Sequence, residues 1–326
     1  MAIGAGVVAL SLVLSACASN EAGSSGASDG ASAGVQTVKV LAFPPEVSDV
    51  WMPLYAANSE GIAAKNGIKF EVSPVQNGAA LVTGVVSGVA PLSTSALSAA
   101  VNAIKGGANI VIIGPALDSA YGYHLMAKTG SGITEVSQLA GKKIGIGSPG
   151  DAGDQFVRYT LQTHGIKADV VSVGAAGKES ALLEGKVDAA FMSPPVSWRL
   201  LTSGKAVTVV DYAVEAKEFS VWIGAKDYVD AHPEVVKRVL TAWYQTVVKL
   251  QNDQPLAVQI LTAPPFKETP EVATKSAAGL KGYPTSGEYT EQMVLDNYKI
   301  LGATQDVSTL PKPSDIATKR FADARG

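Results

Sequence analysis

Strand-like and helix-like patterns of apolar residues alternate along the chain from about residue 37 to residue 210. Apolar residues that alternate with polar ones, or that run together, predict strands at residues 37–43, 69–75, 110–113, 123–127, 143–147, 170–173, 189–192 and 206–210. Apolar residues at helical spacing predict helices at residues 50–58, 79–86, 95–104, 154–164, 178–184 and 196–202. This alternation predicts an α/β fold with largely parallel sheets that carry helices on both faces.

The pattern changes at Pro233, where a helical region begins. Proline suits the first position of a helix, and an apolar stripe with helical spacing continues from Val236 to Leu250. Further helices are predicted at residues 256–261, 271–279 and 288–301. The chain has 326 residues, and single hydrophobic cores seldom grow past roughly 250 to 300 residues, so two lobes are expected.

The N-terminal segment has the composition of a targeting signal followed by a tether. The apolar run at residues 7–16 is too short to cross a bilayer, and Leu14-Ser15-Ala16-Cys17 resembles the lipobox of bacterial lipoproteins. We therefore expect a signal peptide at residues 1–16, lipidation of Cys17, and a Ser/Gly/Ala-rich tether at residues 17–34. Because the first basic residue is Lys39, we also expect the start codon to lie upstream.

Charge and cysteine content exclude several classes of function. The net charge is −3 with scattered Lys and Arg residues, which gives no basic patch for nucleic acid. The single cysteine excludes an internal disulfide, and the three histidines lie far apart without an HExxH or CxxC motif, so no metal site is expected. The GxGxxG at residues 145–150 contains Pro149, and no acidic residue ends the next strand, so no dinucleotide cofactor is expected.

Three turns between a predicted strand and a predicted helix bring small polar residues together. They hold Ser93-Thr94-Ser95, the segment from Gly147 to Gly150, and Ser193-Pro194. Ligands of open α/β sheets bind at the carboxyl ends of strands, where helix N-termini offer free N–H groups. Each Ser is also a good helix N-cap, which is its commonest role at such a position.

Four short motifs, in order along the chain, resemble one family of bacterial proteins. They are WMPLYAA at residues 51–57, LAGKKIG at residues 139–145, LLEGKVDAA at residues 182–190 and HPEVV at residues 232–236. The ordered set is similar to solute-binding proteins of ABC importers of the nitrate, sulfonate and taurine type. That group also includes proteins that bind precursors of the thiamine pyrimidine.

The resemblance implies a periplasmic-binding-protein type II fold, with two doubly wound lobes joined by two crossover strands. Residues 35–122 and 220–326 would form one lobe, and residues 123–219 the other. The resemblance also implies an extracytoplasmic receptor, expected to be monomeric, that closes on a small solute without catalysis or cofactor. Its expected partners are the solute, an ABC permease with its ATPase, and the membrane through the lipid on Cys17.

The same resemblance implies which residues contact the solute. Ser93, Thr94 and Ser95 match the hydroxyl-rich loop of the first lobe. The matching loops of the second lobe carry Ser148, Gly150, Asp151, Ser193 and Pro194. Trp51 and Trp222 are expected as walls and Tyr121 near the crossover, although the lobe core is an equally good place for each of these aromatic residues, and Asp151 is an equally good N-cap.

The sequence leaves the solute and two other classes of function open. Asp118, Asp151 and Asp154 lie in or near the expected cleft, and no Lys or Arg falls in the three turns, which favours a taurine-like zwitterion or a neutral heterocycle over a bare anion. An adhesion or structural lipoprotein would need no cleft. An enzyme on this fold, of the kind that makes the thiamine pyrimidine in eukaryotes, would rely on a Cys-rich motif that the chain lacks.

Overall fold

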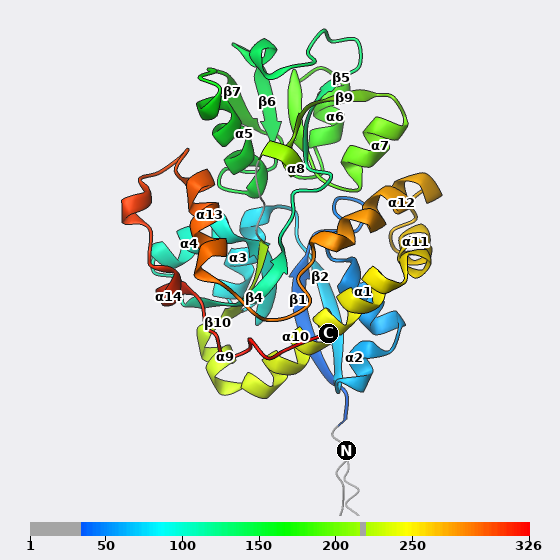
Figure 1. Cartoon of the computed structure of the whole chain (residues 1–326), viewed down its shortest axis with the longest axis vertical. Coiled ribbons are helices and arrows are strands. Elements are labelled where there is room, and N and C mark those ends of the chain that lie inside the picture. Colours follow the sequence, from blue (N-terminus) through cyan, green and yellow to red (C-terminus); the bar gives the residue numbers. More distant parts are fainter. Residues whose placement is uncertain (1–33, 216–219) are drawn as a thin grey trace, which may run out of the picture. The chain divides into compact units, whose positions relative to one another are not determined.

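Two five-stranded sheets organise the chain in the computed structural model, which describes residues 34–215 and 220–326 (Figure 1). The expected signal peptide and Cys17 lie outside these residues. The first sheet has the strand order β2-β1-β3-β10-β4, and the second has β7-β6-β8-β5-β9. We call the first sheet with the helices packed on it lobe 1, and the second sheet with its helices lobe 2.

The strands of lobe 1 are β1 (Gln36–Ala42), β2 (Ile68–Pro74), β3 (Leu92–Ala96), β4 (Ile110–Leu117) and β10 (Ser220–Ala225). Those of lobe 2 are β5 (His124–Lys128), β6 (Lys143–Ile146), β7 (Asp169–Ser172), β8 (Ala189–Met192) and β9 (Ala206–Asp211). β10 runs antiparallel to both of its neighbours, and so does β5. Each of these two strands is the first that the chain forms after it passes from one sheet to the other.

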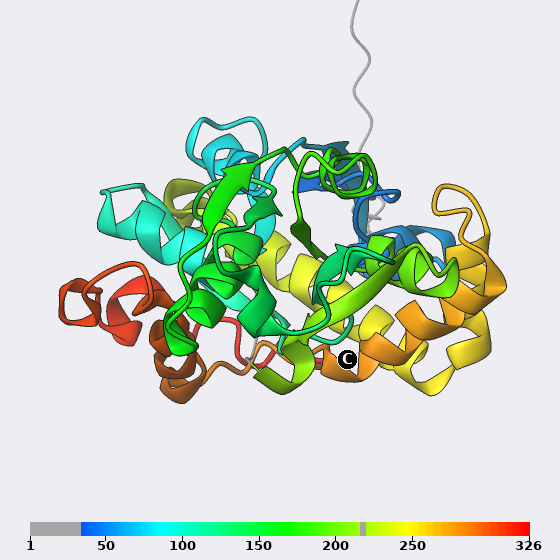
Figure 2. The same ribbon diagram turned by 90° about the horizontal axis from the view of Figure 1, so that it is seen from above.

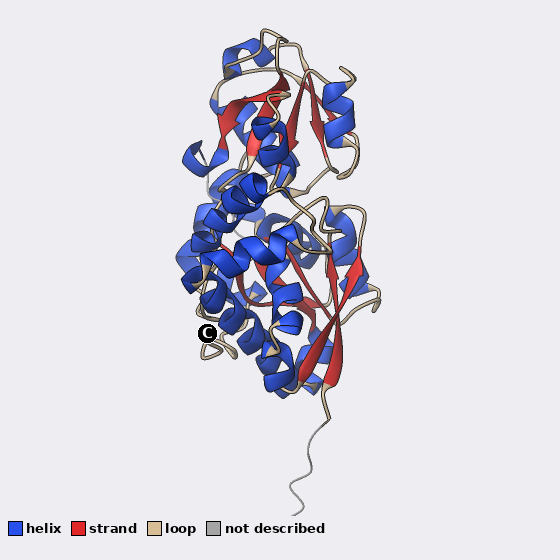
Figure 3. Ribbon diagram, turned by 90° about the vertical axis from the view of Figure 1, so that its right-hand side faces the viewer, coloured by secondary structure: helices blue, strands red, loops and turns tan. Residues whose placement is uncertain are grey.

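Helices pack around both sheets (Figure 3). Lobe 1 carries α1 (Met52–Ser59), α2 (Ile62–Lys65), α3 (Gly78–Val86), α4 (Leu97–Lys105), α9 (Lys226–Ala231), α10 (Pro233–Asn252), α11 (Gln254–Thr262), α12 (Pro270–Ala278), α13 (Glu291–Leu301) and α14 (Pro313–Ile316). Lobe 2 carries α5 (Ala152–Thr163), α6 (Lys178–Leu183) and α7 (Val196–Thr202), and α8 (Tyr212–Glu215) follows β9. Single 3-10 turns occur at Val136–Leu139, Gly279–Gly282 and Val307–Thr309. The α/β architecture expected from the alternating pattern, and the two lobes expected from the chain length, are confirmed. The sheets are mixed and not largely parallel, because β5 and β10 pair antiparallel with both of their neighbours.

Two strands of lobe 1 differ from the sequence-based prediction. Ser93, Thr94 and Ser95 were expected in a turn and at the start of a helix, but they belong to β3, which pairs with β1 and β10. β10 itself was not predicted. The polar sequence LSTSA does not have the apolar pattern of a strand, although its residues are buried on both faces of the sheet. It is extended because it pairs with a strand on each side.

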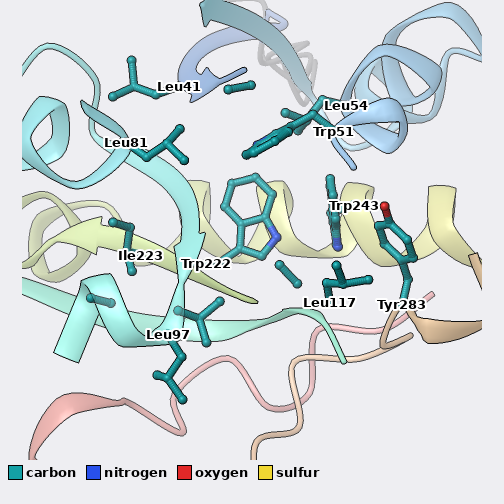
Figure 4. Packing of buried hydrophobic residues seen from close by; sticks show 14 of the residues in the cluster. Leu41, Trp51, Leu54, Leu81, Leu97, Leu117, Trp222, Ile223, Trp243 and Tyr283 are labelled. Carbon is teal, nitrogen blue, oxygen red and sulfur yellow. The ribbon is translucent and has the colours of Figure 1, made fainter. Parts of the chain in front are cut away.

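The long helix α10 forms the centre of the lobe 1 core. Its apolar stripe buries Val236, Val239, Leu240 and Trp243, as its helical spacing predicted. Trp243 meets Trp222 of β10 edge to face, with ring centroids 5.2 Å apart (Figure 4). Trp222 has no exposed surface, so it packs the sheet of lobe 1 onto this helix.

The C-terminal helices of lobe 1 reach lobe 2 on two sides (Figure 2). On one side α13 contacts α5, and the Thr304 hydroxyl donates a hydrogen bond to Gln155 Oε1 at 3.0 Å. On the other side α12 contacts α7. The two lobes are therefore held together by contacts at both flanks as well as by the chain that passes between them.

Candidate functional site

A cavity of about 100 Å³ lies between the two lobes and is lined by residues of both. Lobe 1 contributes the end of β3, the first residue of α3, and aromatic side chains of the loop after β1 and of α10. Lobe 2 contributes the start of α5, the turn after β7, and the end of β8. A cavity of roughly 10 to 15 Å³ is enough to hold one water molecule, so this cavity has room for several waters or for a small organic molecule.

The lobe 1 wall combines buried hydroxyls with an apolar surface. Thr94 and Ser48 are 5% and 4% exposed, both line the cavity, and within the described part of the chain neither hydroxyl has a hydrogen-bond partner. The Ser95 hydroxyl donates to the Ala96 carbonyl at 3.1 Å. Neither hydroxyl oxygen is fully buried, so both can form a hydrogen bond with water or with a ligand in the cavity.

The lobe 2 wall begins at the turn between β6 and α5. Asp151 is the N-cap of α5, because its carboxylate accepts hydrogen bonds from the backbone N–H of Asp154 at 2.9 Å and of Ser148 at 2.7 Å. The N–H of Gly150 donates to Asp154 Oδ2 at 2.8 Å, and Gly150 has a φ of +80°, a conformation that favours glycine. The turn thus uses its polar groups to start the helix.

Asp151 faces a lysine across the cavity lining. Burial raises the pKa of Asp151, and the positive charge of Lys178 together with the two backbone hydrogen bonds lowers it. Burial lowers the pKa of Lys178, and the charge of Asp151 raises it. Lys178 is the first residue of α6, and its Nζ lies 5.1 Å from the centroid of the Phe191 ring. The site therefore holds one carboxylate and one ammonium group, each partly removed from water.

Aromatic side chains form much of the remaining surface. Trp51 of lobe 1 meets Phe43 edge to face at 5.1 Å between centroids, and Phe191 of lobe 2 lies beside Tyr123 at 5.7 Å. Trp243 also lines the cavity. An aromatic surface of this kind fits a ring or a short hydrocarbon chain.

The residues expected at the site fall into three groups. Trp51, Thr94, Ser95, Asp151 and Ser193 line the cavity. Tyr121 and Pro194 line a neighbouring space of about 20 Å³. Neither space is lined by Ser93, Ser148, Gly150 or Trp222.

The third group has structural partners instead. The Ser93 hydroxyl donates to the Leu41 carbonyl at 3.2 Å inside the sheet, and Trp222 lies in the core against Trp243 (Figure 4). The backbone N–H groups of Ser148 and Gly150 are used within the turn that starts α5.

Several lining residues were missed by the sequence analysis, above all Lys178. It follows a fourth strand-to-helix turn, Gly174-Ala175-Ala176-Gly177, which has no hydroxyl and so did not stand out. The same rule that selected the other three turns, a small-residue segment between strand and helix, would have selected this one. Phe43, Trp243 and Tyr283 could not be assigned from sequence, because any of them fits a core position equally well.

An arginine of lobe 2 joins the two lobes at the rim of the cleft. Arg199 of α7 donates from Nη1 to Glu268 Oε1 at 2.8 Å and from Nη2 to the Glu46 carbonyl at 2.9 Å. Both acceptors belong to lobe 1. Arg199 also forms an ion pair within lobe 2, because Glu179 Oε2 lies 3.7 Å from its Nη2 atom. The contacts with lobe 1 exist only while the lobes are together.

Two further features bear on the class of protein. None of the described helices is both long and apolar enough to span a membrane. Within residues 34–215 and 220–326, no three His, Cys, Asp or Glu side chains come together in a way that could hold a metal ion.

A family model described as "NMT1/THI5 like" matches residues 49–255. No protein in a search of curated sequences matches the chain significantly.

Solved structures with the same fold come from several bacteria. A ligand-binding component of an ABC-type import system from Staphylococcus aureus, with zinc bound, is 17% identical with a TM-score of 0.73, and the match covers 89% of this chain and 99% of that one. The alkanesulfonate-binding protein SsuA from Xanthomonas axonopodis pv. citri, bound to MOPS, is 16% identical with a TM-score of 0.71 and coverages of 89% and 96%. The periplasmic nitrate-binding protein NrtA from Synechocystis PCC 6803 is 16% identical with a TM-score of 0.62 and coverages of 87% and 75%. These likenesses show that this chain has the periplasmic-binding-protein fold.

Proposed function

The chain belongs to the NMT1/THI5-like family, and we propose that it is the extracytoplasmic solute receptor of an ABC importer. It binds a small organic solute in the cleft between the lobes and delivers it to the permease, without catalysis. The observation that supports this most is the cavity itself, because it takes its lining from both lobes and is faced by hydroxyls that have no hydrogen-bond partner among the described residues. The lobe boundaries after residues 122 and 219 are part of this proposal.

Closure of the lobes on the solute supplies the signal that the permease reads. A ligand shifts such an equilibrium only by its extra contacts in one state, and a molecule between Thr94 and Lys178 makes those contacts only when the lobes are together. Arg199 and its partners at the rim stabilise the same closed state. The closed surface then differs from the open one over both lobes, which gives the permease a shape to recognise.

The solute is a small organic molecule, either sulfonate-like, as taurine is, or a heterocycle such as a thiamine precursor. The aromatic surface of Trp51, Phe43 and Phe191 supports an organic body, and the hydroxyls and Lys178 support polar groups on it. The aromatic area is large for a bare inorganic ion such as nitrate, which gains little from apolar walls.

The receptor is attached to the membrane by a lipid on Cys17, with residues 18–34 as the tether. Two acyl chains on one cysteine anchor a protein stably where a single chain binds only marginally. Labelling of growing cells with palmitate tests this proposal, since the wild-type protein should take up the label and Cys17→Ala should not. Label on the variant would contradict the anchor without affecting the solute-binding proposal.

Native mass spectrometry of the purified body, begun at Gly34, tests solute binding directly. Protein purified from its own host under mild conditions should carry an added mass that disappears on partial unfolding and dialysis. The refolded protein should regain that mass when it is mixed with a small-molecule extract of the same cells. A protein that gains no mass from the extract, although it is shown to be folded, would argue for the alternative of an adhesion or structural lipoprotein.

A further inference from the structure

Lys178 places a positive charge in the cleft that has no ion-pair partner among the described residues. Its side chain is half-buried, and among the described residues it neither forms a salt bridge nor donates a hydrogen bond. Its Nζ lies 5.1 Å from the centroid of the Phe191 ring, and the charge of Asp151 raises its pKa. An ammonium group has three N–H donors, and leaving them without acceptors away from bulk water is costly.

Among the described residues, no hydrogen bond or ion pair joins Asp151 to that ammonium, and the oxygens of Asp151 already have other donors. They accept two backbone N–H groups at 2.7 and 2.9 Å, from Ser148 and Asp154. Asp151 also caps the twelve-residue helix α5, whose N-terminal dipole offsets a negative charge. The carboxylate therefore has hydrogen-bond donors from the fold, whereas the ammonium has no acceptor among residues 34–215 and 220–326 and interacts with the charge of Asp151 only through space.

The other polar groups of the cavity add donors rather than negative charge. Ser48, Thr94 and Ser193 line it with hydroxyls that have no hydrogen-bond partner among residues 34–215 and 220–326. Asp151 is the only carboxylate in the described lining. Hydroxyls together with an ammonium form a set that matches an acceptor-rich, negatively charged group.

Lys178 also lies where the cavity meets a second one. We call the cavity of about 100 Å³ the inner cavity. It shares Lys178, Val47, Ala175 and Ser193 with a second space of about 190 Å³, whose lining also holds Glu46, Glu179 and Arg199. A group bound at Lys178 therefore lies where the two spaces meet, and the rest of the inner cavity is left for an apolar body.

We propose that the solute carries one negatively charged group, which binds Lys178 where the two spaces meet, and an apolar or aromatic body that fills the inner cavity. This inference rests on the proposed receptor function and names its substrate class: an organic acid rather than a zwitterion or a neutral heterocycle. Lys178 determines that specificity.

The test compares pairs of compounds that differ in a single charge. Benzenesulfonate with benzenesulfonamide, and benzoate with benzamide, differ in the negative group, while ethanesulfonate and taurine differ in an added ammonium. Dissociation constants are measured by titration calorimetry on solute-free protein. One hydrogen-bonded charge contributes about 10-fold to 100-fold in affinity, so the acids should bind more tightly than the amides by a factor of that size.

Three variants connect the preference to the lysine. Lys178→Met keeps the length of the side chain and should remove the preference for the acid, whereas Lys178→Arg should retain it. Lys186→Met is the matched control, because Lys186 is 70% exposed and pairs with Glu184 on the surface of the same lobe. This control should bind as the wild type does. Equal unfolding midpoints of the variants exclude misfolding as the cause.

The possible outcomes separate the inference from the function on which it rests. Acid preference in the wild type and in Lys186→Met, lost in Lys178→Met, supports both. Amides that bind as tightly as acids, taurine that binds better than ethanesulfonate, or Lys178→Met with its acid preference intact would overturn the inference and leave the receptor function standing. No binding by any compound, together with no mass gained from the cell extract, would count against both.

Discussion

The contact that Arg199 makes between the lobes provides a direct way to change closure without touching the inner cavity. Arg199→Ala removes the hydrogen bonds to Glu268 and to the Glu46 carbonyl, both of which cross from lobe 2 to lobe 1. Because Arg199 is absent from the lining of the inner cavity, the variant keeps all the solute contacts proposed there.

The size of the effect follows from the geometry. Hydrogen bonds to charged groups contribute about 1.5 to 3 kcal/mol each. The Glu268 side chain is only 5% exposed, but that of Arg199 is 32% exposed and partly screened by water. Taking about 2 kcal/mol for the whole contact, the ratio of closed to open protein should fall roughly 30-fold. The dissociation constant of the solute should rise by up to the same factor if the open state dominates without solute.

The assay is titration calorimetry with the solute that stabilises the wild type best, together with X-ray scattering to follow closure. Arg158→Ala is the matched control, because Arg158 pairs with the buried Asp154 at 2.7 Å entirely within α5 of lobe 2. We expect Arg199→Ala to bind about 30-fold more weakly and to remain more extended with solute present, and Arg158→Ala to affect only stability. Unchanged affinity and scattering in Arg199→Ala, or equal losses in both variants, would refute the reasoning.

Three further predictions concern stability. Trp222→Ala should lower the free energy of unfolding by about 3 to 5 kcal/mol in urea titrations, because it empties a fully buried site against Trp243, and a loss below about 1 kcal/mol would contradict that packing. Asp151→Ala should cost about 1 kcal/mol through loss of the N-cap of α5, and Asp151→Ser should recover most of it; equal losses in the two variants would show that capping is not the cause. Burial raises the pKa of Asp49 from 3.8 to about 6. The negative charge of Glu268 also raises this pKa, whereas the Ser276 hydroxyl and the positive charge of Arg199 lower it. Since the folded state then binds the proton more tightly than the unfolded state, this group should make the protein less stable as the pH rises from about 4 to about 6, by at most about 3 kcal/mol, and Asp49→Asn should remove that slope from urea unfolding curves. An identical slope in the variant would assign it to another group.

The elements that sequence predicted well are those whose pattern is local. The stripe of α10, from Val236 to Leu250, needs only helical spacing to be recognised, and it is buried as expected. The strands of lobe 2 are short apolar runs between turns, which is also a local signal. β3 was missed because Ser93, Thr94 and Ser95 are strand residues only through their pairing with β1 and β10, which sequence does not reveal.

The candidate site was predicted in part for the same reason. The rule that small polar turns after strands face the cleft found Thr94 and Ser193, and the family resemblance added Asp151; all three line the cavity. It could not tell which polar groups would be used inside the turns, as happens to the N–H groups of Ser148 and Gly150. Lys178 lies in the lining because of where the turn after β7 sits relative to β6 and β8, which depends on the order of strands in the sheet.

A thermal-shift screen of the solute-free body tests the central claim, that the cleft binds a small solute, most directly. The panel holds alkanesulfonates, taurine, aromatic acids and their amides, nitrate, thiamine precursors and a small-molecule extract of the host cells. A solute at 1,000 times its dissociation constant adds about 4 kcal/mol to the folded state, which for a protein of this size raises the unfolding midpoint by about 8 °C. We predict a rise of that size with one class of organic acid, and a smaller rise in Lys178→Met. No rise with any compound or with the extract, from protein shown to be folded and free of bound solute, would contradict the receptor function.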